Sequence, residues 1–101
     1  MELYIELCGP WVETDEPDRP PEGITVSENV EIREDLSLVE NIVLGLFLIV
    51  AGIPATVASL WIYDYLRKHG TARIRIDEEE ILMDDREEVV RIVRRKIEVG
   101  E

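Results

Sequence analysis

The chain has one cysteine and one histidine among its 101 residues, and this scarcity excludes several kinds of site. A single cysteine cannot form an internal disulfide, which is typical of a reducing compartment. Cys8 and His69 are also too few to supply the ligands of a zinc site. Cys8 ends an alternating segment with no base near it in the sequence, and His69 lies at a predicted helix end, where a positive charge is favoured. We therefore expect neither residue to be catalytic.

Basic residues are scarce as well. The chain has 11 lysines and arginines against 23 acidic residues, a net charge of −12 at pH 7. Such a chain repels phosphate backbones, so no nucleic-acid partner is expected. The first residues are acidic and alternate with apolar ones, a pattern that does not fit a signal peptide.

Motifs for catalysis are missing too. The sequence has no glycine-rich phosphate loop, no nucleophile motif and no pair of acids spaced for acid–base chemistry. An acidic cluster could attract a hard cation, but its spacing lacks the pattern of a calcium-binding loop, and a solvated turn followed by a helix cap accounts for it. Its members are Asp77, Glu78, Glu79, Glu80, Asp84 and Asp85. We expect a protein that is not an enzyme and holds no cofactor or metal.

What the sequence does contain is a long uncharged run, NIVLGLFLIVAGIPATVASLWIY, at residues 41–63. A helix of about 20 apolar residues can span a bilayer. Acids precede the run and Arg67 and Lys68 follow it, so a membrane helix here would place the C-terminus in the cytoplasm. Pro54 removes a helical hydrogen bond, and the Gly52–Pro54 segment therefore predicts a kink or a break between two shorter helices.

The ends of the predicted helical segment carry capping signals. Ser37 followed by Glu40 matches a capping box at a helix start. Basic residues and then Gly70 mark the end near His69. These signals predict an apolar helical segment over residues 37–69.

Alternating apolar and polar residues predict strands on both sides of this segment. We expect a strand at residues 1–8, one long or two short strands at 24–33, a proline-rich acidic loop at 9–23, a β-hairpin at 72–83 and an amphipathic helix at 84–99. The sequence thus predicts one small α+β domain over residues 1–101, in the order β-β-α-β-β-α. Its mixed or antiparallel sheet is covered by the kinked or broken apolar helix and the C-terminal helix.

Strands on both sides of the apolar helix favour a single compartment. A membrane span would separate the two sets of strands into parts too small to fold alone. We therefore expect a cytoplasmic homo-oligomer or a protein bound to a protein partner. The alternative is a small membrane-anchored or membrane-dipping protein with residues 41–63 in the bilayer.

Small residues in the apolar segment indicate where another helix could approach closely. We expect an interface formed by Gly45, Gly52, Ala55, Ala58, Ser59 and Trp61. Packing of these residues against the protein's own sheet is the other interpretation.

Three segments carry a resemblance to a known class of proteins: AGIPATVASLWIYDYLRK (51–68), ARIRI (72–76) and EEVVRIV (87–93). Their layout resembles that of the effector-associated constant components of prokaryotic conflict systems. The resemblance covers about half the chain. It implies a non-enzymatic partner of effector proteins and assigns no functional residue.

Overall fold

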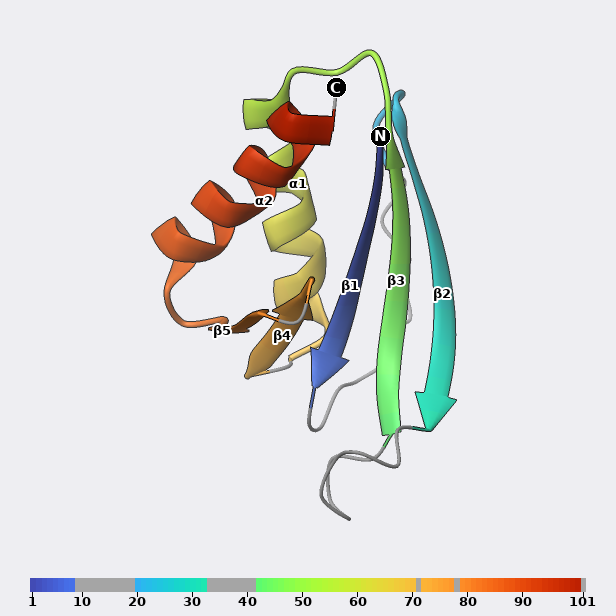
Figure 1. The fold of residues 1–101 in the computed structure, drawn as a ribbon, viewed down its shortest axis with the longest axis vertical. Helices are drawn as coiled ribbons and strands as arrows, with labels where there is room; N and C mark the ends of the chain where they lie inside the picture. Colours follow the sequence, from blue (N-terminus) through green and yellow to red (C-terminus); the bar gives the residue numbers. More distant parts are fainter. Residues whose placement is uncertain (9–19, 33–41, 71, 78, 101) are drawn as a thin grey trace.

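The computed structural model describes residues 1–8, 20–32, 42–70, 72–77 and 79–100. These residues form five strands and two helices (Figure 1). In chain order they are β1 (Glu2–Cys8), β2 (Ile24–Ile32), β3 (Ile42–Val50), α1 (Ala55–Lys68), β4 (Arg73–Ile76), β5 (Glu79–Leu82) and α2 (Arg86–Gly100). The predicted capping box at Ser37–Glu40 and most of the predicted loop at 9–23 lie outside the described residues.

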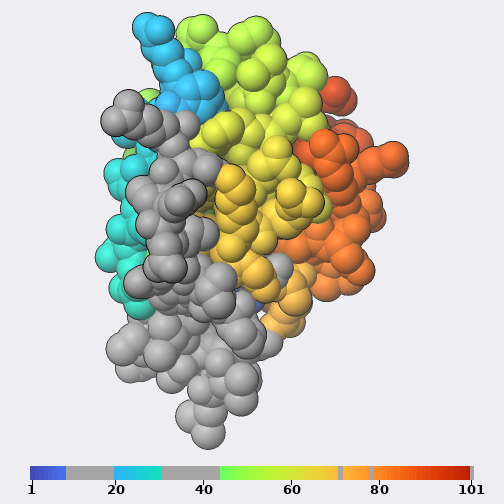
Figure 2. Space-filling model, turned by 180° about the vertical axis from the view of Figure 1, so that it is seen from behind, coloured from blue at the N-terminus to red at the C-terminus, as the bar shows by residue number. Residues whose placement is uncertain are grey.

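The strands form one antiparallel sheet in the order β2-β3-β1-β4-β5. Both helices lie on the same side of it, and they form much of the surface seen from behind (Figures 1 and 2). The predicted α+β class is therefore confirmed, as an antiparallel sheet with two helices.

The predicted helix over residues 37–69 is wrong in its first half, because residues 42–50 form strand β3. The element order is consequently β-β-β-α-β-β-α, and residues 41–63 are not one helix, kinked or otherwise. Strand β3 buries Leu46 and Leu48 in the core and has the apolar Phe47 and Ile49 on its other face, so it lacks the alternation of apolar and polar residues that separates a strand from a buried helix. In the part of the chain that the structure describes, no helix has both the length and the apolar character needed to cross a membrane.

The predicted break at Gly52–Pro54 is the turn between β3 and α1. Gly52 has a φ of +71°, a conformation that suits glycine. Pro54 occupies the N-cap position, and its fixed φ is compatible with a helix start. Helix α1 then continues to Lys68, close to the predicted end.

The core lies between the sheet and the helices. Alternate residues of β1 and β3 point toward the helices and are buried. They pack with buried residues of α1 and α2 in one cluster, which includes Leu3, Ile5, Leu7, Leu46, Leu48, Ile62, Leu66, Val89, Val93 and Ile97. Neither of the two described helices lies on the opposite side of the sheet, here called the outer face.

The C-terminal elements occupy the segments where a hairpin and a helix were expected. Arg75 lies opposite Glu80 in the β4–β5 hairpin, as the alternation predicts. At the start of α2, the Glu88 N–H donates a hydrogen bond to Asp85 Oδ1 at 3.2 Å. One turn further along the helix, Arg91 forms an ion pair with Glu88, with 2.6 Å between nitrogen and oxygen.

Candidate interaction surface

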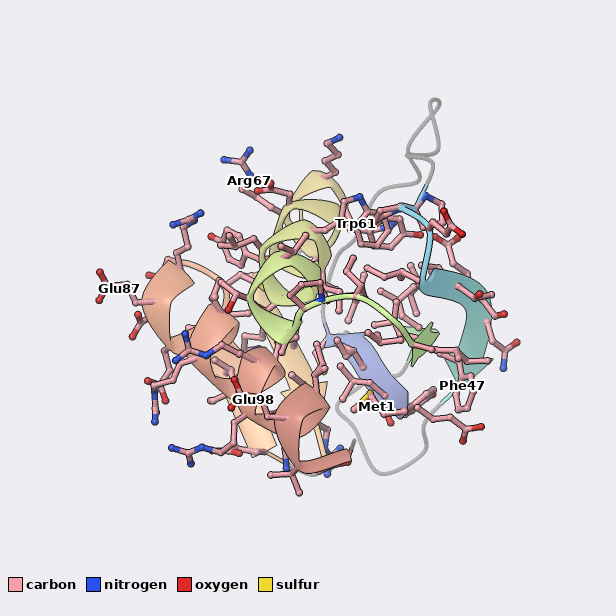
Figure 3. The ribbon with its side chains drawn as sticks, turned by 90° about the horizontal axis from the view of Figure 1, so that it is seen from above. Met1, Phe47, Trp61, Arg67, Glu87 and Glu98 are labelled. Atoms are coloured by element: carbon pink, nitrogen blue, oxygen red, sulfur yellow. The ribbon has the colours of Figure 1, made fainter. Side chains whose placement is uncertain are left out.

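Two large apolar side chains of the interior strand β3 are exposed on the outer face. Phe47 is 38% exposed and Ile49 is 42% exposed, whereas the neighbouring Leu46 and Leu48 are fully buried. Figure 3 shows Phe47 on the side of the sheet away from the helices. The alternation of β3 therefore places one set of side chains in the core and presents the other to the surroundings.

The strand register determines the neighbours of these two side chains. Phe47 lies between Tyr4 of β1 and Ser27 of β2, and Ile49 lies between Glu2 and Thr25. Tyr4, Phe47 and Ile49 thus form an apolar patch, here called the Phe47 patch, with polar or acidic residues on both sides. Cross-strand pairs of aromatic residues such as Tyr4 and Phe47 stabilise a sheet and hold the rings in a defined place.

Gly45 belongs to this arrangement rather than to a helix interface. It lies in β3, two residues before Phe47, and is buried. A β-carbon at this position would lie 2.5 Å from the Tyr4 hydroxyl oxygen and 3.1 Å from two ring carbons. The absence of a side chain at position 45 is therefore what allows the Tyr4 ring to lie across the strand.

A hollow of about 250 Å³ lies beside the patch, between the start of β1 and the end of α2. On one side of β1, strand β4 pairs with Ile5–Cys8 and does not reach the first residues. There the start of β1 borders the hollow, while its other side pairs with β3. Its apolar wall includes Met1 and the strongly exposed Val99. An ion pair between Lys96 Nζ and Asp77 Oδ2, 2.9 Å apart, closes one end.

The other end of the outer face is buried and polar. Glu6 and Cys8 are both less than a tenth exposed. Burial, followed by the nearby carboxylates of Glu6 and Glu80, raises the pKa of the Cys8 thiol. A raised pKa keeps the thiol protonated at neutral pH and lowers its reactivity as a nucleophile.

The structure does not bring the six predicted interface residues together. Ala58 and Ser59 are fully buried in the protein's own core, and the Ser59 hydroxyl donates to the Thr56 carbonyl at 3.0 Å. Gly52 is exposed in the turn, and a β-carbon at this position would meet no atom within 4 Å. Ala55 and Trp61 are half-buried on α1.

Trp61 belongs to a cluster that joins α1 to β2, and sequence reasoning missed this cluster. Its ring stacks on Tyr65 with centroids 5.3 Å apart, and Tyr65 meets the His69 ring edge-on at 5.1 Å. The Tyr65 hydroxyl donates to Glu28, and His69 Nε2 lies 3.5 Å from the same carboxylate oxygen. The spacing of 61, 65 and 69 by four residues, which places side chains on one helix face, was the available signal.

Two of the described acidic residues at the hairpin have structural roles. Asp77 pairs with Lys96 and Asp85 caps α2. Within the described ranges, no three His, Cys, Asp or Glu side chains are grouped so that they could hold a metal ion.

No protein-family model, curated protein or solved structure matches this chain.

Proposed function

We propose that this chain is a non-enzymatic binding module of the cytoplasm that docks a partner protein through the Phe47 patch. One observation carries the proposal: the interior strand β3 presents Phe47 and Ile49 on the face of the sheet opposite the two described helices. Aromatic side chains surrounded by polar residues are typical of the energetic centre of a protein interface.

The electrostatics favour a partner with a basic rim. Glu2 borders the patch next to Ile49, and the whole chain carries a charge of −12. An acidic surface accelerates association with a basic one and disfavours acidic competitors. The adjacent hollow can accept an apolar side chain of the partner, since Met1 and Val99 line it. The resemblance to effector-associated constant components agrees with a non-enzymatic partner role.

Two sites on this chain allow a matched test. Phe47 and Leu60 are both 38% exposed, but Leu60 lies on α1, on the other side of the molecule. A photoreactive amino acid is introduced at position 47 or at position 60, and the full-length protein is irradiated in its native cells. We expect a discrete protein adduct from position 47 and none from position 60.

The adduct is then identified, and the partner is purified for binding measurements. We expect Phe47→Ser to raise the dissociation constant about thirtyfold, the effect of removing an interface hot spot. Leu60→Ser should leave it unchanged. An adduct from position 60 alone, or equal effects of the two substitutions, would contradict docking through the Phe47 patch.

A further inference from the structure

Strand β2 forms one edge of the sheet, and it is long. It has nine residues, and in the described part of the chain its only strand partner is β3. The opposite edge strand, β5, has four residues and begins with Glu79 and Glu80. Short, charged edges resist pairing with other chains, whereas long edges invite it. The two edges of this sheet therefore differ in their capacity to pair.

The backbone of β2 alternates between its partner strand and the open edge. The Ala51 N–H donates to the Gly23 carbonyl at 2.8 Å, whereas the Ile24 N–H donates to the Pro21 carbonyl in the preceding turn. Continuing this alternation along an antiparallel ladder turns the N–H and C=O groups of Thr25, Ser27 and Asn29 toward β3. Those of Val26, Glu28 and Val30 then point outward from the sheet.

The side chains along this edge are compatible with pairing. Neither lysine, proline nor glycine occurs in Ile24–Val30, and Val30 is 54% exposed. The only charge in this segment is Glu28, whose carboxylate accepts a hydrogen bond from Tyr65 and lies near His69. Among the side chains of this segment, Glu28 is therefore the one protective feature of the kind found on edge strands.

We propose that a second copy of this chain pairs with this edge, β2 against β2 in antiparallel orientation, with Ser27 on the two-fold axis. The sheets of the two copies then join into one. The outer faces lie on the same side, so the assembly presents two Phe47 patches.

The sequence of β2 restricts the registers that such a pair can adopt. With Ser27 on the axis, Ile24 lies opposite Val30, Thr25 opposite Asn29, and Val26 opposite Glu28. A register centred on Glu28 would place the two Glu28 carboxylates directly opposite each other, which is destabilising. A register centred on Val26 would shorten the paired segment to residues 24–28. The Ser27 register pairs residues 24–30 without a like-charge pair. A register centred on Asn29 would pair residues 26–32, and Asn29→Cys would then cross-link by itself.

Single cysteines distinguish these registers. In antiparallel pairing, residues whose backbone groups point away from the partner lie about 4.5 Å apart at Cα, within the range for a disulfide. In a Cys8→Ala background, Ser27→Cys should form a covalent dimer under mild oxidation. Thr25→Cys and Asn29→Cys should each remain monomeric in denaturing electrophoresis, but a mixture of the two should cross-link.

Association itself is measured without cysteines, by light scattering and sedimentation of the unmodified chain. We expect a dimer. Val30→Pro removes an outward N–H and leaves the β2–β3 ladder intact, so it should weaken dimerisation by about thirtyfold through the loss of one hydrogen bond per strand. Val30→Thr keeps the N–H and should dimerise like the parent.

A monomeric mass at all concentrations would overturn the proposal, as would a dimer that cross-links through other positions or withstands Val30→Pro. The edge groups are distinct from the side chains of the Phe47 patch. A chain that dimerises but gives no adduct from position 47 would therefore contradict only the proposed function, and the reverse result would contradict only the β2 pairing.

Discussion

A β-carbon at position 45 would lie 2.5 Å from the hydroxyl oxygen of Tyr4, so these two residues are coupled. We predict that Gly45→Ala displaces the Tyr4 ring and destabilises the protein by about 1 kcal/mol, the low end of overpacking costs. In a Tyr4→Ser background the same substitution should be neutral or stabilising, since alanine loses less backbone entropy than glycine in a strand. Urea unfolding of the four proteins measures the coupling. Equal costs in both backgrounds would show that Tyr4 is not the cause.

The glycines at positions 45 and 52 illustrate what the sequence can predict about single residues. Gly45 and Gly52 were both selected because small residues allow close approach, and both positions are special in the structure. The reasons differ, however: one accommodates an aromatic ring, and the other takes a positive φ in a turn. The sequence marks a position where a side chain is missing, but the group that fills the space is determined by pairing with residues far along the chain.

A hydrogen bond between Tyr65 and Glu28 connects helix α1 to the edge strand β2. The Tyr65 hydroxyl donates to a carboxylate whose side chain is 45% exposed. We predict that Tyr65→Phe lowers the free energy of unfolding by about 1 kcal/mol, a value that allows for solvent screening of this acceptor.

A double-mutant cycle isolates this interaction. In a Glu28→Ala background, Tyr65→Phe should have almost no effect, because the acceptor has already been removed. The stability of each protein is obtained from denaturant unfolding. A Tyr65→Phe cost that is unchanged by Glu28→Ala would indicate that ring packing, and not the hydrogen bond, accounts for it.

The elements with clear periodicity were predictable, and the uncharged run was not. Strand β1, the β4–β5 hairpin and helix α2 each have one apolar and one polar side, so their type follows from spacing. Strand β3 has apolar residues on both sides, because Leu46 and Leu48 enter the core while Phe47 and Ile49 form the outer patch. The same residue types could fill a buried helix. Pairing of β3 with both β1 and β2 decides in favour of a strand.

For the whole molecule, the class was predictable because strands are predicted on both sides of the apolar run and an amphipathic helix follows it. The sheet order was not, since β3 pairs with two strands that precede it in the sequence. The Phe47 patch could not be predicted from the sequence for the same reason, because only the strand register places Tyr4 beside Phe47. Long-range pairing of this kind leaves no local spacing to detect.

Charge acts on the molecule as a whole. A net charge of −12 on 101 residues favours expansion of the chain and repulsion between copies. Raising NaCl from about 0.01 M to about 0.1 M shortens the Debye length from roughly 30 Å to roughly 10 Å. We therefore predict that salt raises the melting temperature and, if β2 strands pair, tightens the dimer.

A variant with a smaller net charge tests this prediction, and its two substitutions lie outside both proposed surfaces. Glu87 and Glu98 are exposed on α2, and replacing both by lysine changes the net charge of the chain by four, from −12 to −8. Self-repulsion falls steeply as the net charge becomes smaller, so the melting temperature of Glu87→Lys/Glu98→Lys should respond less to NaCl than that of the parent. Calorimetry across the salt range compares the two. If the melting temperatures of both proteins respond equally, the effect of salt comes from ion binding or hydration and not from screening of the net charge. A melting temperature that falls as salt is added would mean that attractive ion pairs outweigh the repulsion.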